Sequence, residues 1–348
     1  MMKQILIIDS TLRDGSHAIG QQFARDDISK YAAGAEKAGI KILMVGHGNG
    51  LGASSLQLGF SKLTDREMLK TAKSQLTKTK LGAFLIPGFG TIEDDLTPAL
   101  KLGVQVVMVA SHCTEANVTK QHVEYLSGRH ITTYGVLMMA HMISAKKLLE
   151  QAKLMQSYGV SGVLIMDSAG NMLPEDVRAR ISTLAAGLKV DVGFHAHNNL
   201  GMAIANSITA VRAGAKIIDG TSRGLGAGAG NCQLEVIVAV LLRTGYKLDL
   251  DLYQLMDNSE EIIADIMKRP QVISSISLTS GIAGVFSGFA PHAKRAAKKF
   301  KVDPRDILIE LGKRKIIAGQ EDIILDVAMN IAQKKKVVKE NAEIEALI

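Results

Sequence analysis

The sequence predicts an α/β fold, a (β/α)8 TIM barrel followed by a helical C-terminal domain. Short apolar runs rich in Val and Ile recur along the first 250 residues, as is typical of strands buried on both faces of a parallel sheet. Longer amphipathic stretches separate these runs, and several end in a glycine of the kind that follows a helix. The strand–helix unit occurs eight times, which indicates a closed barrel.

The eight strands are expected to alternate with helices along the chain. The candidate strands are residues 5–9, 42–46, 81–86, 105–110, 132–138, 162–167, 192–197 and 216–220. The clearest candidate helices are residues 24–39, 64–76, 114–128, 144–159, 173–187 and 231–245. A doubly wound sheet is the alternative architecture, but such a sheet rarely needs eight regular units over this length.

The last part of the chain has a different pattern. From about residue 250 the strand signal fades, and the remaining segments have helical periodicity. We therefore expect a catalytic barrel over residues 1–250 and a helical domain over residues 251–348. The helical domain is expected to serve contact with a partner protein or dimerisation.

The composition is that of an ordinary globular enzyme, with 47% hydrophobic and 22% charged residues. Aromatic residues make up 4% and tryptophan is absent, which argues against a nucleic-acid reader built on base stacking. The net charge of +7 comes from scattered basic residues, with denser clusters at 294–301 and 333–339. We interpret these clusters as solvated helix faces rather than polyanion sites, and expect no nucleic-acid partner.

Cysteine usage and hydropathy bear on the compartment. Cys113 and Cys232 lie far apart and lack the spacing of a disulfide framework, which favours a reducing compartment. The first residues lack the pattern of a signal peptide, and no apolar run reaches the ~18 residues of a membrane span. A cytoplasmic location without a membrane partner is expected.

The most informative motif is the His-x-His pair of His195 and His197, at the end of the seventh apolar run. Residues two apart on a strand point to the same face, so both imidazoles can bind one metal ion. Asp14, after the first apolar run, can supply a carboxylate oxygen. Two histidines and one carboxylate leave coordination positions open for a substrate, as catalytic metal sites require.

A barrel would bring these three residues together. Strands 1 and 7 are separated only by strand 8, and catalytic groups lie at the C-terminal ends of barrel strands. Taken alone, Asp14 could be a helix N-cap, but the convergence favours a metal ligand. Arg13 beside it is expected to stabilise an oxyanion, with a surface cation as the alternative. His17, whose unperturbed pKa is about 6.5, is expected to act as a general base, with a loop hydrogen-bonding role as the alternative.

Other residues at predicted strand ends converge on the same mouth, namely His47, Asp167 and Ser168. His112 and His141 are weaker candidates, because neither has an obvious metal partner. The glycine-rich segment 224–231 could cradle an anion with backbone N–H groups, but it lacks the Lys-Ser/Thr of a nucleotide P-loop. We interpret it as a tight turn around the substrate mouth.

Lysine placement argues against imine chemistry. Carbonyl chemistry in a barrel enzyme can use a Schiff-base lysine at a C-terminal strand end. Here Lys41, Lys80 and Lys216 stand at the beginnings of strands, on the opposite face of the barrel. The metal route is therefore favoured.

Several motifs spread along nearly the whole chain resemble the 4-hydroxy-2-oxovalerate aldolases. This family is one of the metal-dependent pyruvate-lyase barrels related to hydroxymethylglutaryl-CoA lyase and isopropylmalate synthase. The motifs are TLRDGSHAIGQQF, HCTEANVTKQHVEY, LMMAHMI, HAHNNLGMAIANS, GAGAGN and AGQEDIILDVAMN.

The resemblance implies a role for each site residue. Asp14, His195 and His197 would hold a divalent ion, usually Mn²⁺, with Co²⁺ or Mg²⁺ as alternatives. Arg13, Ser168 and His195 would contact the 2-oxo acid, and Arg13 would stabilise the metal-bound pyruvate enolate. His17 would take the proton of the 4-hydroxyl group as an aldehyde leaves. The family also implies an acylating aldehyde dehydrogenase as partner, and hence a homo- or hetero-oligomer.

The sequence departs from the family pattern at four positions. Phe286 stands where the family usually has a tyrosine, which removes a hydroxyl group from the site. Met44 replaces a common Glu, Asn49 a common Asp, and Ala169 a Gly. The metal ligands are unchanged, so we expect retained lyase chemistry with a different aldehyde or acceptor.

Two alternative functions share the same barrel. One is a condensation of an acyl-CoA with a 2-oxo acid, which would use the same metal and Arg13. The other is a catalytically impaired partner subunit, for which Phe286, Met44 and Asn49 are the motivation. The C-terminal segment around AGQED argues against the first, because such synthases usually have different C-terminal domains.

Overall fold

The computed structural model describes residues 4–267 and 269–345. Its first part is a closed barrel of parallel strands that follow one another in chain order. The strands are β1 (Leu6–Leu12), β2 (Ile42–Val45), β3 (Lys80–Leu85), β4 (Val106–His112), β5 (Thr132–Met138), β6 (Gly162–Asp167), β7 (Asp191–Ala196) and β8 (Ile217–Gly220). All eight overlap the predicted strands, so the predicted fold class is confirmed.

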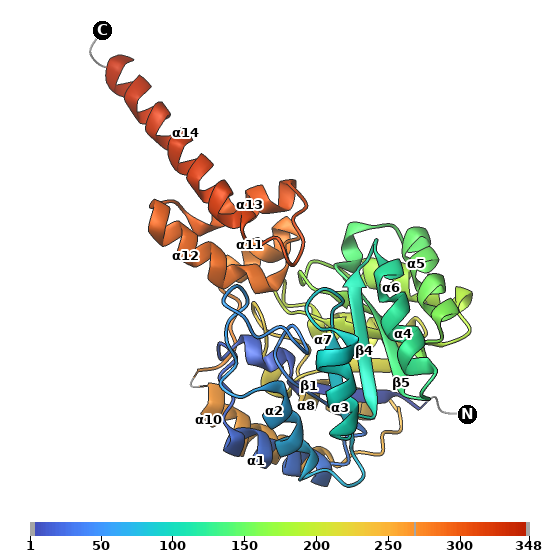
Figure 1. Ribbon diagram of the computed structural model, residues 1–348. Coiled ribbons are helices and arrows are strands. Elements are labelled where there is room, and N and C mark those ends of the chain that lie inside the picture. The colour runs from blue at the N-terminus through green and yellow to red at the C-terminus, as the bar shows by residue number, and fades with distance from the viewer. Residues whose placement is uncertain (1–3, 268, 346–348) are drawn as a thin grey trace.

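Helices cover the outside of the barrel (Figure 1). They are α1 (Arg25–Lys37), α2 (Asp65–Lys73), α3 (Thr97–Lys101), α4 (Lys120–Ser127), α5 (Ala145–Tyr158), α6 (Pro174–Gly187), α7 (Ala203–Arg212) and α8 (Leu234–Arg243). Each returns the chain to the start of the next strand or to the barrel base, since parallel neighbours need a crossover connection. The helix predicted over 114–128 is divided, because a 3-10 turn, η3 (Ala116–Thr119), precedes α4.

The barrel strands bury side chains on both faces, as their unbroken apolar runs predict. Ile8, Met44 and Leu164 belong to a cluster inside the barrel. Ile7 and Ile165 belong to the larger cluster between the strands and the surrounding helices. Because successive strand residues point to opposite faces, these two packed layers fix the direction of each polar side chain at the strand ends.

The remaining helices form two groups. They are α9 (Leu252–Asn258), α10 (Ala264–Met267), α11 (Ser275–Ala283), α12 (Ala290–Phe300), α13 (Pro304–Lys313) and α14 (Ile323–Glu345). Leu255 of α9 and Met267 of α10 pack into the barrel's outer cluster. A second apolar core lies among α11 to α14 and includes Phe289, Leu308 and Val327. Helix α14 starts in this core and then extends away from the rest of the molecule (Figure 1).

The second core lies over the C-terminal ends of the barrel strands. The N–H of Ser287 donates to the carbonyl oxygen of Ser168, just after β6, at 3.0 Å. The side-chain amide of Asn171 donates to the carbonyl oxygen of Gly281 at 2.7 Å. These contacts hold the helical part at the barrel mouth, where the active sites of this fold are found. No helix within the described residues is long and apolar enough to cross a membrane.

Candidate metal centre

Asp14, His195 and His197 meet at the barrel mouth, as their positions in the sequence predict. β1 ends at Leu12, and the chain then turns through Arg13 into a short 3-10 helix, η1 (Asp14–His17). His195 lies in β7, and His197 follows the end of that strand. One ligand atom from each of the three residues lies within 4.8 Å of the others, and all three side chains are buried.

Asp219 of β8 orients the first histidine. It is the register partner of His195, and its Oδ2 accepts a hydrogen bond from His195 Nδ1 at 2.9 Å, with both side chains fully buried. This bond places the imidazole proton on Nδ1 and leaves the lone pair on Nε2. His195 Nε2 has no hydrogen-bond partner among the described residues, as expected of a metal ligand whose other nitrogen is held by a carboxylate.

His197 also carries an unsatisfied nitrogen. Its Nδ1 is buried and lacks a hydrogen-bond partner within the described residues, and its ring lies edge-on to that of His195 with centroids 5.1 Å apart. Burial lowers the pKa of His197 to about 3, although the Asp14 carboxylate opposes this shift. The imidazole is therefore neutral near pH 7, which is the form that binds a metal ion.

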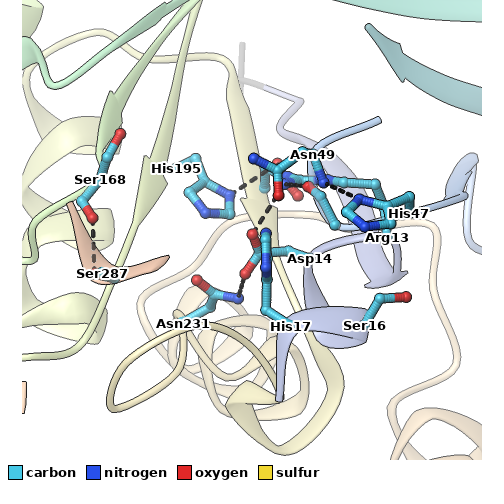
Figure 2. Close-up of polar contacts among 12 residues, drawn as sticks. Arg13, Asp14, Ser16, His17, His47, Asn49, Ser168, His195, Asn231 and Ser287 are labelled. Atoms are coloured by element: carbon cyan, nitrogen blue, oxygen red, sulfur yellow. Dashed lines mark hydrogen bonds and ion pairs between the residues drawn. The ribbon is translucent and has the colours of Figure 1, made fainter. Parts of the chain in front are cut away.

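Asp14 supplies the negative charge. Burial alone would raise its pKa, but the Arg13 guanidinium and the nearby His197 hold the pKa well below its usual range. The side-chain amide of Asn231 donates to its Oδ2, as Figure 2 shows. One carboxylate and two orphaned imidazole nitrogens in a buried pocket fit a divalent metal ion, since an unsatisfied polar group of this kind is costly without a ligand.

Arg13 lies beside the carboxylate with part of its guanidinium unpaired. Its Nη1 donates to Asp14 at 2.9 Å and to the Gly48 carbonyl oxygen at 3.3 Å, and its Nη2 lies 3.8 Å from Asp219. Its Nε and Nη2 form no hydrogen bond with any described residue although they are buried. The face of the guanidinium lies 4.5 Å from the centroid of the Phe84 ring, which holds the free edge in one plane.

His17 lies at the end of the same turn and lines a cavity of about 270 Å³ under the helical part. Burial and the charge of Arg13 lower its pKa, while Asp14 partly opposes the shift. The Gly48 N–H donates to the Gln21 side-chain oxygen, so the Gln21 amide nitrogen faces His17 Nδ1, at 3.4 Å. In this arrangement Nδ1 carries the lone pair of a neutral ring.

Ser168 lies apart from the metal ligands. Figure 2 shows it beside Ser287, to the left of His195. The Ser287 hydroxyl donates to the Ser168 carbonyl oxygen at 2.7 Å, and Ser168 Oγ accepts a hydrogen bond from the Met139 N–H at 3.0 Å. The hydroxyl proton of Ser168 is thus left to donate to a bound group.

The other candidate histidines have structural partners. His47 Nδ1 accepts a hydrogen bond from the Asn49 N–H at 3.0 Å, and its Nε2 lies 3.1 Å from the Gly59 carbonyl oxygen. His141 Nε2 lies 3.2 Å from the Gly284 carbonyl oxygen. Burial lowers the pKa of both histidines to about 4, so both are neutral. These two rings tie loops together at the mouth.

His112 and Asp167 are also engaged locally. His112 Nδ1 lies 2.8 Å from the Thr114 hydroxyl oxygen. The Asp167 carboxylate accepts hydrogen bonds from the N–H groups of Asn171 and Met172, which closes the turn after β6. Burial raises the pKa of Asp167 to about 6, although these hydrogen bonds oppose the rise.

The glycine-rich segment 224–231 forms the turn that the sequence predicts at the mouth. A Cβ atom at Gly226 would lie 2.5 Å from Asp14 Oδ2. A glycine is needed here because the backbone passes directly over the carboxylate. The last residue of the segment, Asn231, donates a hydrogen bond to Asp14 Oδ2, so the segment helps to hold this carboxylate in place.

Asp219 and Asn231 are functional candidates that the sequence argument missed. Asp219 was visible as a carboxylate near the end of the eighth predicted strand, adjacent to the strand that carries His195. Asn231 carried no such signal, because its contact with Asp14 spans 217 residues of chain.

The four departures from the family pattern lie near the mouth or in the barrel. Phe286 packs edge-on against Phe289, with ring centroids 5.5 Å apart. Met44 lies inside the barrel, and Asn49 caps His47 through its N–H. Ala169 accepts a hydrogen bond at its carbonyl oxygen from Asn199. None of these contacts involves Asp14, His195 or His197.

The lysines lie where the sequence places them. Lys80 begins β3, and Lys41 and Lys216 precede β2 and β8 and form ion pairs with Asp249 and Asp191. All three are therefore at the end of the barrel opposite Asp14.

Comparison with known proteins gives two family matches and close relatives. Residues 4–262 match the HMGL-like family, and residues 271–333 match the DmpG-like communication domain. The chain is 52% identical to a 4-hydroxy-2-oxovalerate aldolase of Carboxydothermus hydrogenoformans over 97% of this chain and 100% of that protein. It is 51% identical to an aldolase of the same name from Spirochaeta aurantia, over 95% and 97% of the two chains.

A solved structure with the same fold is the carboxyl transferase domain of Rhizobium etli pyruvate carboxylase. It has a TM-score of 0.80 and 16% identity, and the match covers 96% of this chain and 61% of the other. At this identity the likeness concerns the fold alone.

Proposed function

The chain belongs to the HMGL-like family and, within it, to the 4-hydroxy-2-oxovalerate aldolases, and on this premise we propose how its residues carry the reaction. The enzyme is a metal-dependent carbon–carbon lyase that cleaves 4-hydroxy-2-oxo acids to pyruvate and an aldehyde. The observation that best supports a single site for this chemistry is the buried set of Asp14, His195 and His197, whose ligand atoms lie within 4.8 Å of one another.

These three residues are the proposed metal ligands. The ion, when bound, supplies a Lewis acid that draws electron density from the ketone of the substrate. His195 would use Nε2, because Asp219 occupies its Nδ1. We propose Mn²⁺ as the resident ion, with Co²⁺ or Mg²⁺ as alternatives, since a mixed nitrogen and oxygen donor set accepts each of them.

Arg13 and Ser168 are proposed to hold the 2-oxo acid. Cleavage of the C3–C4 bond leaves its electron pair on the pyruvate half, as an enolate. The unpaired Nε and Nη2 of Arg13 offer two charge-assisted hydrogen bonds to the developing oxyanion in a site that excludes water. The free hydroxyl proton of Ser168 is proposed to contact the substrate carboxylate.

His17 is proposed as the base that starts the cleavage. Its lowered pKa keeps the ring neutral near pH 7, so it can accept the proton of the 4-hydroxyl group as the C4 carbonyl forms. In the tautomer that Gln21 favours, the ring's only lone pair is on Nδ1, so the substrate hydroxyl would replace the 3.4 Å contact of the Gln21 amide nitrogen there. The same proton can later return to C3 of the enolate to give pyruvate.

The helical part is proposed to contact an acylating aldehyde dehydrogenase. Support comes from the match of residues 271–333 to the DmpG-like communication domain, and a hetero-oligomer would follow.

The division into a barrel of residues 1–250 and a helical domain of residues 251–348 stays a prediction, and the packing of α9 and α10 on the barrel favours a break after residue 267. Two buried free cysteines support the cytoplasm as the proposed compartment.

The test is pyruvate release from racemic 4-hydroxy-2-oxopentanoate after EDTA treatment, with and without added Mn²⁺. We expect activity only with the metal, and Asp14→Ala should lose both activity and tight Mn²⁺ binding measured by calorimetry. Full activity of the metal-free chain would contradict the proposal. Bound Mn²⁺ without pyruvate release would instead favour the impaired-subunit alternative that Phe286 motivates.

A further inference from the structure

The cavity of about 270 Å³ beside His17 reaches from the metal centre to the molecular surface. Its inner end is lined by His17 and by Gly226, whose backbone passes over the Asp14 carboxylate. Its outer end is lined by Arg269 and Lys294, which are both exposed. Among the lining residues, only His17 takes part in the proposed reaction.

The charges around this cavity are positive. None of the described residues that line it is acidic. Arg269 precedes α11 and Lys294 lies on α12, and neither side chain forms an ion pair or a hydrogen bond with any described residue. The first turns of α11 and α12, which lie above the barrel in Figure 1, also border the cavity at Ser277 and Pro291. Helix N-termini carry partial positive charge, so the whole wall favours an anion.

The cavity has room for a short 2-oxo acid and leads to the place where that acid is proposed to react. An apolar protein cavity of about 150 Å³ holds a benzene ring, and this one measures about 270 Å³. Asp14 lies directly behind Gly226, since a Cβ atom at that glycine would come within 2.5 Å of Asp14 Oδ2. A cleft lined by one sign of charge raises the local concentration of an oppositely charged substrate.

We propose that this cavity is the passage by which the anionic 2-oxo acid enters and pyruvate leaves, with Arg269 and Lys294 attracting the carboxylate at its outer end. This inference rests on the proposed aldolase reaction. The two cations act on the approach of the substrate and do not contact its reacting atoms, so they are positioning residues.

The size of the expected effect follows from Coulomb's law. At a separation of about 10 Å in water, one unit charge changes the local concentration of a monoanion about twofold when salt is low. We therefore expect Arg269→Gln/Lys294→Gln to lower kcat/KM for 4-hydroxy-2-oxopentanoate about fourfold at about 10 mM salt. The difference should disappear at about 1 M salt, where charges are screened within about 3 Å. The value of kcat should stay unchanged, because the loss falls on substrate binding.

The assay is pyruvate release by the Mn²⁺-loaded full chain at the two salt concentrations. The control, Lys153→Gln/Arg178→Gln, removes the same charge from exposed positions on α5 and α6 and should match the parent chain at both. If Arg269→Gln/Lys294→Gln equals the parent chain at low salt, the passage is overturned while the aldolase stays intact. A parent chain that releases no pyruvate would overturn the aldolase proposal itself.

A thiol at the outer end allows the charge to be restored or reversed on one folded protein. The native Cys113 and Cys232 are buried, and burial raises the pKa of each thiol to about 12, so a reagent reacts with an exposed introduced thiol instead. Lys294→Cys is labelled with aminoethyl methanethiosulfonate, which restores a cation, or with sulfonatoethyl methanethiosulfonate, which adds an anion. We expect kcat/KM at low salt to be about fourfold lower with the anionic label. Lys153→Cys should show no difference between the labels, and equal values for the two labels on Lys294→Cys would overturn the proposal.

Discussion

The strongest single test of the metal centre is Asp219→Asn, because Asp219 acts on His195 and is not among the proposed ligands. The two side chains form a 2.9 Å hydrogen bond and both are fully buried, so water cannot replace the lost carboxylate. Asparagine keeps an acceptor oxygen but not the charge. Loss of an outer hydrogen-bond partner typically weakens metal binding by about 10- to 100-fold. Because an acceptor remains, we expect roughly 10- to 30-fold, or about 1.4–2 kcal/mol.

The assay is a direct Mn²⁺ titration of the EDTA-treated full chain by calorimetry, without substrate. The control is Asp249→Asn, which makes the same change at an exposed ion pair with Lys41 at the other end of the barrel. The control should bind Mn²⁺ as the parent chain does. A folded Asp219→Asn variant with unchanged Mn²⁺ affinity would refute the argument that this carboxylate holds His195 ready for the metal.

Two further changes probe the substrate side and the barrel base. Phe84→Leu removes the ring that stacks on Arg13 and should lower kcat about tenfold at saturating Mn²⁺. The control is Phe289→Leu, in the second core, which should lower thermal stability and leave kcat unchanged. A kcat of Phe84→Leu equal to that of the parent chain would contradict the role of Phe84. Burial would raise the pKa of Glu36, but hydrogen bonds from segment 77–79 lower it from 4.5 to about 2. The stabilisation of the folded state by ionised Glu36 is therefore complete above pH 4.5 and is lost as the pH falls toward 2. After allowance for solvent screening, denaturant unfolding should show Glu36→Gln less stable by about 1 kcal/mol at pH 7 and equal near pH 2.

The sequence predicts the barrel well because burial and periodicity are local signals. Each strand is an apolar run whose two faces are both covered, so its position can be read without knowledge of its neighbours. The same pattern predicts that Asp14 and His195 come together at the mouth, because closure of eight strands brings β1 and β7 within one strand of each other. The split of the helix before α4 was not predicted, since apolar spacing cannot distinguish a 3-10 turn from an α-helix at this length.

The residues that orient the proposed metal ligands are harder to predict from the sequence than the proposed ligands themselves. Asn231 contacts Asp14 only after the chain has passed around the whole barrel. The orientation of Ser168 depends on Ser287, which belongs to the second core. Such contacts arise from tertiary packing between distant segments, and no local pattern in one sequence specifies them.

The histidines at the mouth illustrate what only the structure can decide. In their position relative to the predicted strands, His47 and His195 are alike, because each follows or ends an apolar run, although only His195 belongs to a His-x-His pair. In the structure both nitrogens of His47 face backbone groups, whereas His195 has one nitrogen held by Asp219 and the other without a described partner. Because a metal ligand needs one fixed and one free nitrogen, this difference favours His195 over His47 as the proposed metal ligand.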